Sequence, residues 1–312
     1  MAFAFVFPGQ GSQSIGMLAE LAAAHPQVKE TFRIAGEVLG FDLWELVQNG
    51  PEESLNRTSN TQPAMLAAGV AVWRVWRANG GALPAVMAGH SLGEYTALVC
   101  AEALRFEDAV ALVAERGRLM QEAVPEGAGA MAAILGLDDE RVRAVCAAAA
   151  QGEVVAAVNF NSPGQVVVAG HVNAVERAVE LAKQEGAKRA VRLPVSVPSH
   201  CELMKPAAER LLERLQQIEI RKPLVPVLHN VDVAAHDDAG AIRTALASQL
   251  HSPVRWVETI QAMAARGVSG LVECGPGKVL VGLNKRISKD MAALAIYDSG
   301  TLSEALANYR ES

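Results

Sequence analysis

One short segment restricts the possible folds of this chain more than any other: Gly89-His90-Ser91-Leu92-Gly93 holds a serine between two glycines in the pattern Gly-x-Ser-x-Gly. In a nucleophile elbow, a strand turns sharply into a helix with a strained serine at the apex, and the two glycines let the backbones pass closely. Such a turn exposes the serine oxygen and directs backbone N–H groups toward the atom that it attacks. The pattern alone also arises by chance in about one in ten chains of this length, so its context decides.

The residues around the motif supply that context. Residues 84–88 have the pattern of a short buried strand, and residues 92–104 have that of a largely apolar helix. A strand, the motif and a helix follow one another in the order that an elbow requires. We therefore predict that Ser91 is a catalytic nucleophile.

The composition favours an α/β fold. Of the 312 residues, 51% are hydrophobic, mostly Ala, Val and Leu, and only 4% are aromatic, which suits buried parallel strands covered by Ala-rich helices. The net charge of −6 argues against nucleic acid as a partner, because phosphate binding requires a basic surface. No apolar run is long enough to cross a bilayer. Residues 1–7 predict a first core strand rather than a signal peptide. We expect a cytoplasmic monomer that binds neither nucleic acid nor membrane.

The cysteines and glycines argue against several other kinds of site. The four cysteines lie far apart without a Cys-x-x-Cys pair, so the sequence indicates neither a disulfide framework nor a zinc site: Cys100, Cys146, Cys201 and Cys274. The loop 8–13 resembles a dinucleotide loop only weakly, because Gly16 falls two residues too late for Gly-x-Gly-x-x-Gly. No lysine stands in a Walker A pattern. We expect no metal and no bound cofactor.

Residues 129–195 have an element order of their own. Strands are expected at 130–135, 154–159, 165–169 and 188–195, with helices at 139–150 and 173–184. The resulting order, β-α-β-β-α-β, is that of a ferredoxin-like unit. The flanking segments alternate strand and helix as a parallel sheet does, and residues 268–274 predict a late strand. We therefore predict an α/β-hydrolase-like large domain (1–128 and 196–312), a ferredoxin-like insert (129–195), and a cleft between them.

A serine hydroxyl needs a base within hydrogen-bond reach, most often histidine. An α/β-hydrolase places that histidine near the C-terminus, whereas no histidine here follows His251, which argues against an ordinary hydrolase. His200 is the best candidate, because two prolines stiffen the segment 193–199 that leads to it from the inserted domain. A structural histidine remains the alternative.

The other histidines and a neighbouring thiol are weaker candidates. His90 adjoins Ser91 on the elbow and is expected to pack elsewhere, and four others are expected at the surface: His25, His171, His229 and His236. Cys201 could be the nucleophile in place of Ser91, but it has no elbow around it, and a buried inert cysteine is the commoner case.

Arg116 interrupts the apolar face of a predicted helix over residues 106–123. A guanidinium that faces a core or a cleft is costly unless it is paired. One interpretation is a buried ion pair with an Asp or Glu of the fold. The other is a bidentate contact with a substrate carboxylate, which arginine suits better than lysine.

Taken together, these motifs resemble those of the malonyl-CoA:acyl-carrier-protein transacylases of bacterial type II fatty acid synthesis. The resemblance spans nearly the whole chain and rests on Phe7-Pro-Gly-Gln-Gly-Ser12, Thr61-Gln-Pro-Ala64, Gly89-His-Ser-Leu-Gly-Glu94, Glu115-Arg-Gly117, Ser196-Val-Pro-Ser-His200 and Glu273-Cys-Gly-Pro-Gly277. It implies that Ser91 is the acylated nucleophile, that His200 is its base, and that Arg116 holds the malonyl carboxylate.

The resemblance also implies supporting roles. The backbone N–H groups of Gln10 and Leu92 would form the oxyanion hole, and the main-chain carbonyl of Gln249 would orient the His200 ring. A neutral carbonyl can set the imidazole tautomer without repelling an anionic substrate, as an acid would. Gln62, Asn159 and Asn161 are further candidates for the substrate pocket.

The activity implied is ping-pong transfer of a malonyl group from malonyl-CoA to the phosphopantetheine thiol of acyl carrier protein, through a malonyl-serine ester, for fatty acid biosynthesis. Acyltransferases of polyketide synthases and of malonate decarboxylase are related alternatives. A serine thioesterase or esterase and a non-catalytic carrier-binding module are the competing classes. Five basic residues are candidates for docking an acidic carrier, with a solvated surface as the alternative: Lys188, Arg189, Lys285, Arg286 and Lys289.

Overall fold

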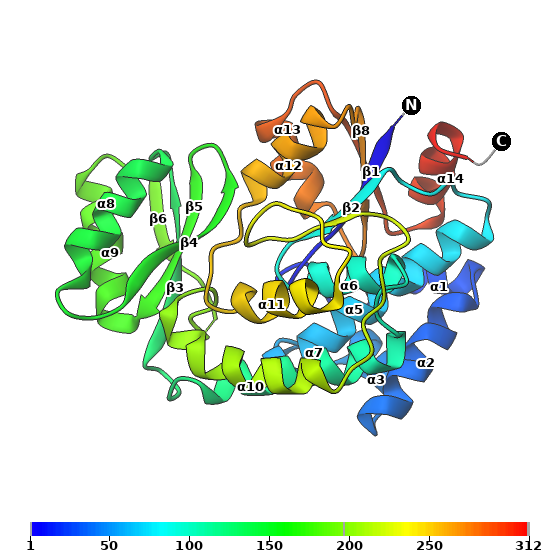
Figure 1. Cartoon of the computed structure of the whole chain (residues 1–312), viewed down its shortest axis with the longest axis horizontal. Helices are drawn as coiled ribbons and strands as arrows, with labels where there is room; N and C mark the ends of the chain where they lie inside the picture. Colours follow the sequence, from blue (N-terminus) through cyan, green and yellow to red (C-terminus); the bar gives the residue numbers. More distant parts are fainter. Residues whose placement is uncertain (1, 196, 311–312) are drawn as a thin grey trace.

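A five-stranded parallel sheet forms the centre of the larger part of the molecule (Figure 1). The computed structural model describes residues 2–195 and 197–310. The strands follow the spatial order β7-β2-β1-β8-β9, and neighbouring strands run parallel. Their bounds are β1 Phe3–Phe7, β2 Val86–Gly89, β7 Val227–Leu228, β8 Gly270–Cys274 and β9 Ala292–Ile296. The expected first and late strands are thus β1 and β8.

Helices cover both faces of this sheet, as its buried strands require. Along β1, Phe3, Phe5 and Phe7 face one apolar cluster, whereas Ala4 and Val6 face another, because successive side chains of a strand point to opposite faces. The helices are α1 Ala19–Ala24, α2 Gln27–Leu39, α3 Leu43–Asn49, α4 Glu52–Leu55, α5 Thr58–Ala78, α6 Gly93–Cys100, α7 Phe106–Glu122, α10 Lys205–Gln216, α11 Ala239–Gln249, α12 Trp256–Ala265, α13 Val279–Ile287 and α14 Ser299–Asn308, with a 3-10 turn at Glu202–Met204.

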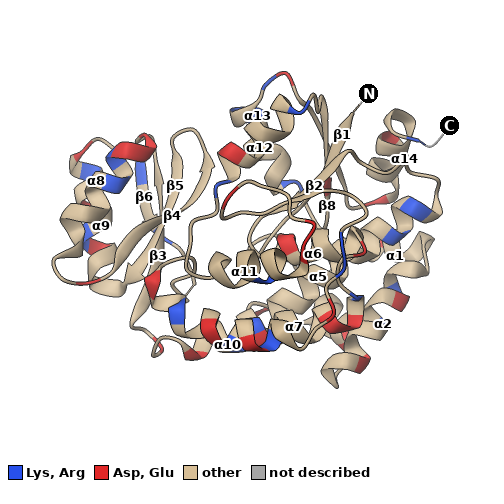
Figure 2. Ribbon diagram, viewed as in Figure 1, with Lys and Arg blue, Asp and Glu red and all other residues tan. Residues whose placement is uncertain are grey.

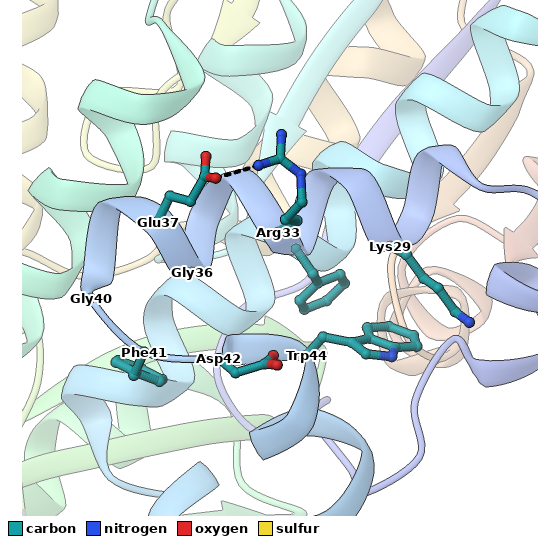
Figure 3. Close-up of a pocket in the computed structure, with 9 residues that line it drawn as sticks. Lys29, Arg33, Gly36, Glu37, Gly40, Phe41, Asp42 and Trp44 are labelled. Carbon is teal, nitrogen blue, oxygen red and sulfur yellow. Dashed lines mark hydrogen bonds and ion pairs between the residues drawn. The ribbon is translucent and has the colours of Figure 1, made fainter.

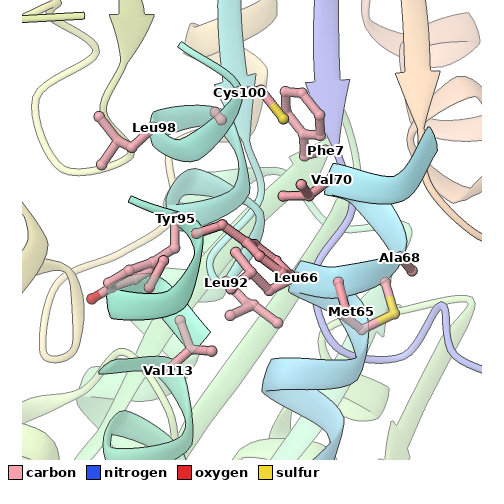
Figure 4. Close-up of a cluster of buried hydrophobic side chains, with 14 of the residues drawn as sticks. Phe7, Met65, Leu66, Ala68, Val70, Leu92, Tyr95, Leu98, Cys100 and Val113 are labelled. Carbon is pink, nitrogen blue, oxygen red and sulfur yellow. The ribbon is translucent and has the colours of Figure 1, made fainter. Parts of the chain in front are cut away.

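The larger apolar cluster packs α5, α6 and α7 against the sheet (Figure 4). Leu66 and Val70 of α5, Leu98 of α6 and Val113 of α7 belong to it and are buried. Because α6 leaves the elbow and α7 carries Arg116, this packing fixes the two helices that present Ser91 and Arg116.

A separate antiparallel sheet follows α7 along the chain. Its strands β3 Gly129–Leu135, β4 Val155–Ser162, β5 Gln165–His171 and β6 Arg189–Arg192 lie in the order β4-β5-β3-β6. Helices α8 Asp139–Ala150 and α9 Val172–Gln184 pack on one face. The other face, with Met131 and Val167, packs against Cys201 and Leu203. The expected order of strands and helices is therefore present, although β6 ends three residues earlier than predicted.

One hydrogen-bonded contact joins the antiparallel sheet to the segment after α11. Val254 N–H donates to Val158 O at 2.8 Å, and Phe160 N–H donates to Val254 O at 3.0 Å, so residue 254 forms a bridge to β4. The chain thus has an α/β fold with a parallel sheet and a separate antiparallel sheet, as expected. The exact domain limits stay a prediction, and Ser196, at one of them, lies outside the described residues. Among the helices described, none combines the length and hydrophobicity that crossing a membrane would need.

Candidate active site

The turn at Ser91 has the geometry of the predicted elbow. Ser91 has a φ of 50°, in the left-handed region that residues other than glycine seldom adopt. A Cβ at Gly89 would lie 1.8 Å from the carbonyl carbon of Gly93, and a Cβ at Gly93 would lie 2.0 Å from Phe7 O. Both glycines are therefore required by steric contact, and the motif has the structural basis expected of it.

His200 lies directly against the serine. Its Nε2 is 2.8 Å from Ser91 Oγ, and its Nδ1 is 2.7 Å from the main-chain oxygen of Gln249. Because a carbonyl can only accept, Nδ1 carries the ring proton and Nε2 is free to accept the serine proton. His200 also has a positive φ, 67°, and its N–H donates to Leu250 O at 2.9 Å. The last residue of α11 thus holds the ring of His200, and the residue after it holds the backbone.

The surroundings keep His200 neutral. Burial and the nearby Arg116 charge lower the pKa of His200 to about 3, although the Gln249 carbonyl opposes this shift. A neutral imidazole can act as a base at pH 7 without losing a proton first.

Arg116 is almost completely buried, with 1% of its surface exposed, and burial lowers its pKa. Its Nη1 donates to Gln62 Oε1 at 2.8 Å, and its Nη2 donates to Gln249 Oε1 at 2.9 Å and to Ser91 Oγ at 3.4 Å. Within residues 2–195 and 197–310, no carboxylate lies in ion-pair contact with Arg116. The predicted alternative of a direct Asp or Glu pair is therefore wrong: neutral oxygens hold the guanidinium and leave its charge beside the serine.

A cavity of about 140 Å³ connects these groups. Its lining includes Gln10, Ser91, Leu92, Arg116 and His200. In the described part of the chain, the backbone N–H groups of Gln10 and Leu92 have no hydrogen-bond acceptor, as the predicted oxyanion hole requires. A larger groove of about 670 Å³ shares several of the lining residues and forms the outer approach to the cavity: Gln10, Thr58, Met120, Val195 and Val197.

The remaining predicted pocket residues take different positions. Asn159 lines the cavity, and its Oδ1 is buried without a partner among the described residues. Asn161 instead contacts His90, with 2.7 Å between Asn161 Oδ1 and His90 Nε2. The His90 ring also packs near Trp256, at 5.5 Å between ring centroids, as expected for a packing role. Gln62 is buried behind Arg116 and contacts it rather than the open cavity.

Sequence reasoning missed a buried polar network behind the elbow. Glu94 accepts hydrogen bonds from His229 Nδ1 at 2.7 Å, from Asn230 N–H at 2.8 Å and from Gln249 Nε2 at 2.9 Å. Burial alone would lower the pKa of His229, but Glu94 raises it above its ordinary value. The prediction that His229 lies at the surface is therefore wrong, since its side chain is fully buried. The signal available was that Glu94 belongs to an otherwise apolar helix.

The thiols do not form an alternative centre. Burial raises the pKa of Cys201 to about 11, and its Sγ lies 3.2 Å from Pro198 O, so this thiol is protonated and not activated. All four cysteines are free and buried. Among the residues described, no group of three or more His, Cys, Asp or Glu side chains could hold a metal ion.

The basic candidates for docking do not form a single patch. Lys285 and Arg286 end α13, which contacts β4, whereas Lys188 and Arg189 lie at β6, the opposite edge of the antiparallel sheet. Arg286 Nη1 donates to Gln165 Oε1 at 2.7 Å. Figure 2 shows acidic and basic residues intermixed along the helices α2, α8 and α10. Which of these groups meets a carrier protein therefore stays a prediction.

Another hollow, of about 510 Å³, lies between α2 and α3 (Figure 3). Its lining combines the apolar rings of Phe32, Phe41 and Trp44 with the ion pair between Arg33 and Glu37. It shares no lining residue with the cavity at Ser91, and its lining includes no serine, cysteine or histidine.

Comparison with known proteins agrees with this geometry. The model of the acyl transferase domain family matches residues 4–298. The malonyl CoA-acyl carrier protein transacylase of Salmonella typhimurium is 60% identical over 304 residues, which cover 97% of this chain and 98% of the relative. An acyl carrier protein S-malonyltransferase from Vibrio cholerae has a TM-score of 0.95 at 60% identity, covering 97% of this chain and 99% of that one.

A further solved structure holds a type II PKS acyl-carrier protein in complex with its malonyl-transacylase. It has a TM-score of 0.98 at 58% identity and covers 99% of this chain and 100% of that one. The match of the family model and these near full-length similarities leave no ambiguity about family. The chain belongs to the acyl transferase domain family and, within it, to the malonyl CoA-acyl carrier protein transacylases.

Proposed function

We propose that this protein transfers a malonyl group from malonyl-CoA to the phosphopantetheine thiol of an acyl carrier protein, and so supplies malonyl carrier protein for fatty acid biosynthesis. The observation that carries the proposal is a charged Arg116 beside the nucleophile, held by neutral partners, the amide oxygens of Gln62 and Gln249 and the ring of Tyr95, with no carboxylate in contact among the described residues. A free carboxylate on the acyl group would complete that site. The names of the relatives support the same substrates.

In the first half-reaction, Ser91 Oγ attacks the thioester carbonyl carbon while His200 Nε2 accepts the hydroxyl proton. The N–H groups of Gln10 and Leu92 stabilise the oxyanion of the tetrahedral intermediate. The C–S bond then breaks, the CoA thiolate takes the proton from His200, and a malonyl-serine ester remains. The Gln249 carbonyl holds the ring in one tautomer during both transfers.

In the second half-reaction, the carrier thiol gives its proton to His200 and attacks the ester carbonyl. The C–O bond to Ser91 breaks, and His200 returns the proton to the serine oxygen. The outer groove that leads to the cavity gives both pantetheine arms a route to Ser91.

Neither half-reaction needs a metal ion or a bound cofactor, since the chain itself supplies nucleophile, base and oxyanion donors. One chain assembles all of these groups, which supports the expectation of a monomer. We also assign the parallel sheet to a hydrolase-like large domain and the antiparallel sheet to a ferredoxin-like insert.

Intact mass spectrometry after mixing with malonyl-CoA tests the proposal. We expect one malonyl adduct per chain, its loss when holo carrier protein is added, and no adduct on a Ser91→Ala variant. Transfer by that variant should fall by at least about 10³-fold, because the nucleophile is lost. Turnover of malonyl-CoA to free malonate without a persistent adduct would instead indicate a hydrolase. Full transfer by Ser91→Ala would refute Ser91 as the nucleophile, and no transfer by the unaltered chain would indicate a non-catalytic carrier-binding module.

A further inference from the structure

The Glu94 carboxylate is completely buried and touches no part of the cavity lining, yet it contacts three groups that lead to the site. Its Oε1 accepts from His229 Nδ1, and its Oε2 accepts both from Asn230 N–H and from the side-chain Nε2 of Gln249. Burial of a carboxylate costs a large desolvation free energy unless hydrogen-bond donors compensate for it. The donors that Glu94 contacts therefore indicate its role.

The contact with Gln249 determines which way that amide faces. Gln249 Nε2 donates to Glu94 Oε2 at 2.9 Å and to Ser91 O at 3.0 Å, which leaves Oε1 facing Arg116 Nη2 at 2.9 Å. A flipped amide would turn its NH2 group toward the guanidinium and its oxygen toward two other acceptors, which is unfavourable on both sides. Two acceptors, Glu94 Oε2 and Ser91 O, therefore hold the amide in the orientation that Arg116 needs.

The same carboxylate also supports the elbow. The backbone of Asn230 is held by Glu94, and the Asn230 side chain accepts from Ser91 N–H at 2.8 Å and donates to Gly89 O at 2.7 Å. Glu94 thus joins the strained serine turn to the guanidinium through two short chains of hydrogen bonds. Gln249 also links the two ends directly, because it donates to Ser91 O and accepts from Arg116.

We infer that Glu94 is a positioning residue for the acyl-carboxylate contact: by accepting from Gln249 it orients the amide that holds Arg116, and so contributes to selection of malonyl over acetyl groups. This inference rests on the proposed function, because it assumes that Arg116 binds the malonyl carboxylate. Glu94 itself touches neither substrate nor reacting atoms. A merely structural role would lower the transfer of all acyl groups alike, whereas a role through Arg116 lowers malonyl transfer selectively.

Two replacements at position 94 separate these roles. Glu94→Met removes both acceptor oxygens at similar volume. Glu94→Gln can keep an acceptor for Gln249 and Asn230, because its NH2 group can face His229, whose ring can change tautomer and accept. Glu273→Met is the matched control, since Glu273 is equally buried and accepts Val281 N–H at 2.8 Å, but contacts none of these groups.

The experiment measures kcat/KM with malonyl-CoA and with acetyl-CoA for each variant, together with its thermal unfolding. Glu94→Met should lower the malonyl-to-acetyl ratio at least about 10-fold, chiefly through a higher KM for malonyl-CoA, since a contact present in both ground and transition states is weakened. Glu94→Gln should keep the ratio within about 3-fold of the original, and Glu273→Met should leave it unchanged. In an Arg116→Ala background, Glu94→Met should lower the ratio no further, because both changes act on one contact.

Equal losses with both acyl groups in Glu94→Met, an equally low ratio in Glu94→Gln, or an additional loss in the Arg116→Ala background would each overturn the inference. If Glu94→Met does not fold, Gln249→Leu takes its place. This replacement removes the side-chain amide of Gln249 but keeps the main-chain carbonyl that faces His200. An unchanged malonyl-to-acetyl ratio in Gln249→Leu would also overturn the inference. Arg116→Ala by itself tests the proposed function. An unchanged malonyl-to-acetyl ratio in Arg116→Ala would refute the carboxylate contact. A ratio that falls in Arg116→Ala but stays unchanged in Glu94→Met would refute only the role of Glu94.

Discussion

The parallel and the antiparallel sheet contribute to the site in different ways. Loops that follow the carboxyl ends of the parallel strands carry reactive or supporting groups: Gln10 follows β1, Ser91 follows β2, and Asn230 follows β7. This is the edge at which open α/β sheets bind ligands. The antiparallel sheet presents Asn159 and Met131 as wall residues, and neither of these two side chains is a nucleophile or a base. The proposed nucleophile and oxyanion donors thus follow strands of the parallel sheet, whereas the antiparallel sheet contributes to the cavity wall.

His200 shares the cavity lining with Met131 and Asn159 of the antiparallel sheet and with Ser91 after β2, and its replacement should give the largest effect in this comparison. His200→Ala should lower the rate of serine acylation by roughly 10³-fold, within the range for loss of a general base. Stopped-flow measurement of CoA release checks this. Because we propose that Ser91 and His200 act as a unit, a Ser91→Ala/His200→Ala double variant should be no slower than Ser91→Ala. A multiplicative loss in the double variant would show that the histidine acts elsewhere.

A buried acid within the parallel sheet should affect stability rather than chemistry. Burial raises the pKa of Glu273 to about 7, although backbone N–H groups of α13 oppose this shift. The folded state therefore holds a proton that the unfolded state releases near pH 4.5, so this group makes the protein less stable as pH rises toward and through 7. The full effect is about 3 kcal/mol.

Urea unfolding of the wild-type chain and of Glu273→Gln at several pH values checks the direction of this pH dependence of stability. As pH rises from 5 to 8, the free energy of unfolding of the variant should increase relative to that of the wild type by about 2 kcal/mol. A difference that stays constant with pH, or that changes in the opposite direction, would show that Glu273 is ionised in the folded protein.

The smallest effect should come from the antiparallel sheet. Asn161→Ala removes the hydrogen bond to His90 that links β4 to the elbow, and should lower kcat/KM less than about 10-fold, equally for malonyl-CoA and acetyl-CoA. Steady-state kinetics with both substrates checks this. A selective loss with malonyl-CoA would mean that this sheet contributes to acyl recognition and would break the distinction between the two sheets.

The elbow was predictable because it is local: two glycines, a serine, a strand and a helix are neighbours in sequence. The succession of strands and helices along residues 129–195 was likewise readable from periodicity. His229 and Asn230 were not predictable from spacing, because they meet Glu94 only after β7 pairs beside β2. The helix pattern around Arg116 also could not distinguish a carboxylate partner from an amide. The oxygens that accept from Arg116 belong to Gln62 and Gln249, which are far from Arg116 in the sequence.

The backbone at Ser91 and His200 has a further consequence for how this protein can change. Both residues occupy left-handed backbone conformations in which a side chain costs of order 1 kcal/mol or more, and in which glycine would be at ease. Selection for stability alone would therefore favour replacing the two residues that we propose as nucleophile and base. An engineer who optimises this protein for heat resistance should hold both positions fixed and seek stability elsewhere, because here thermal robustness and activity trade against each other.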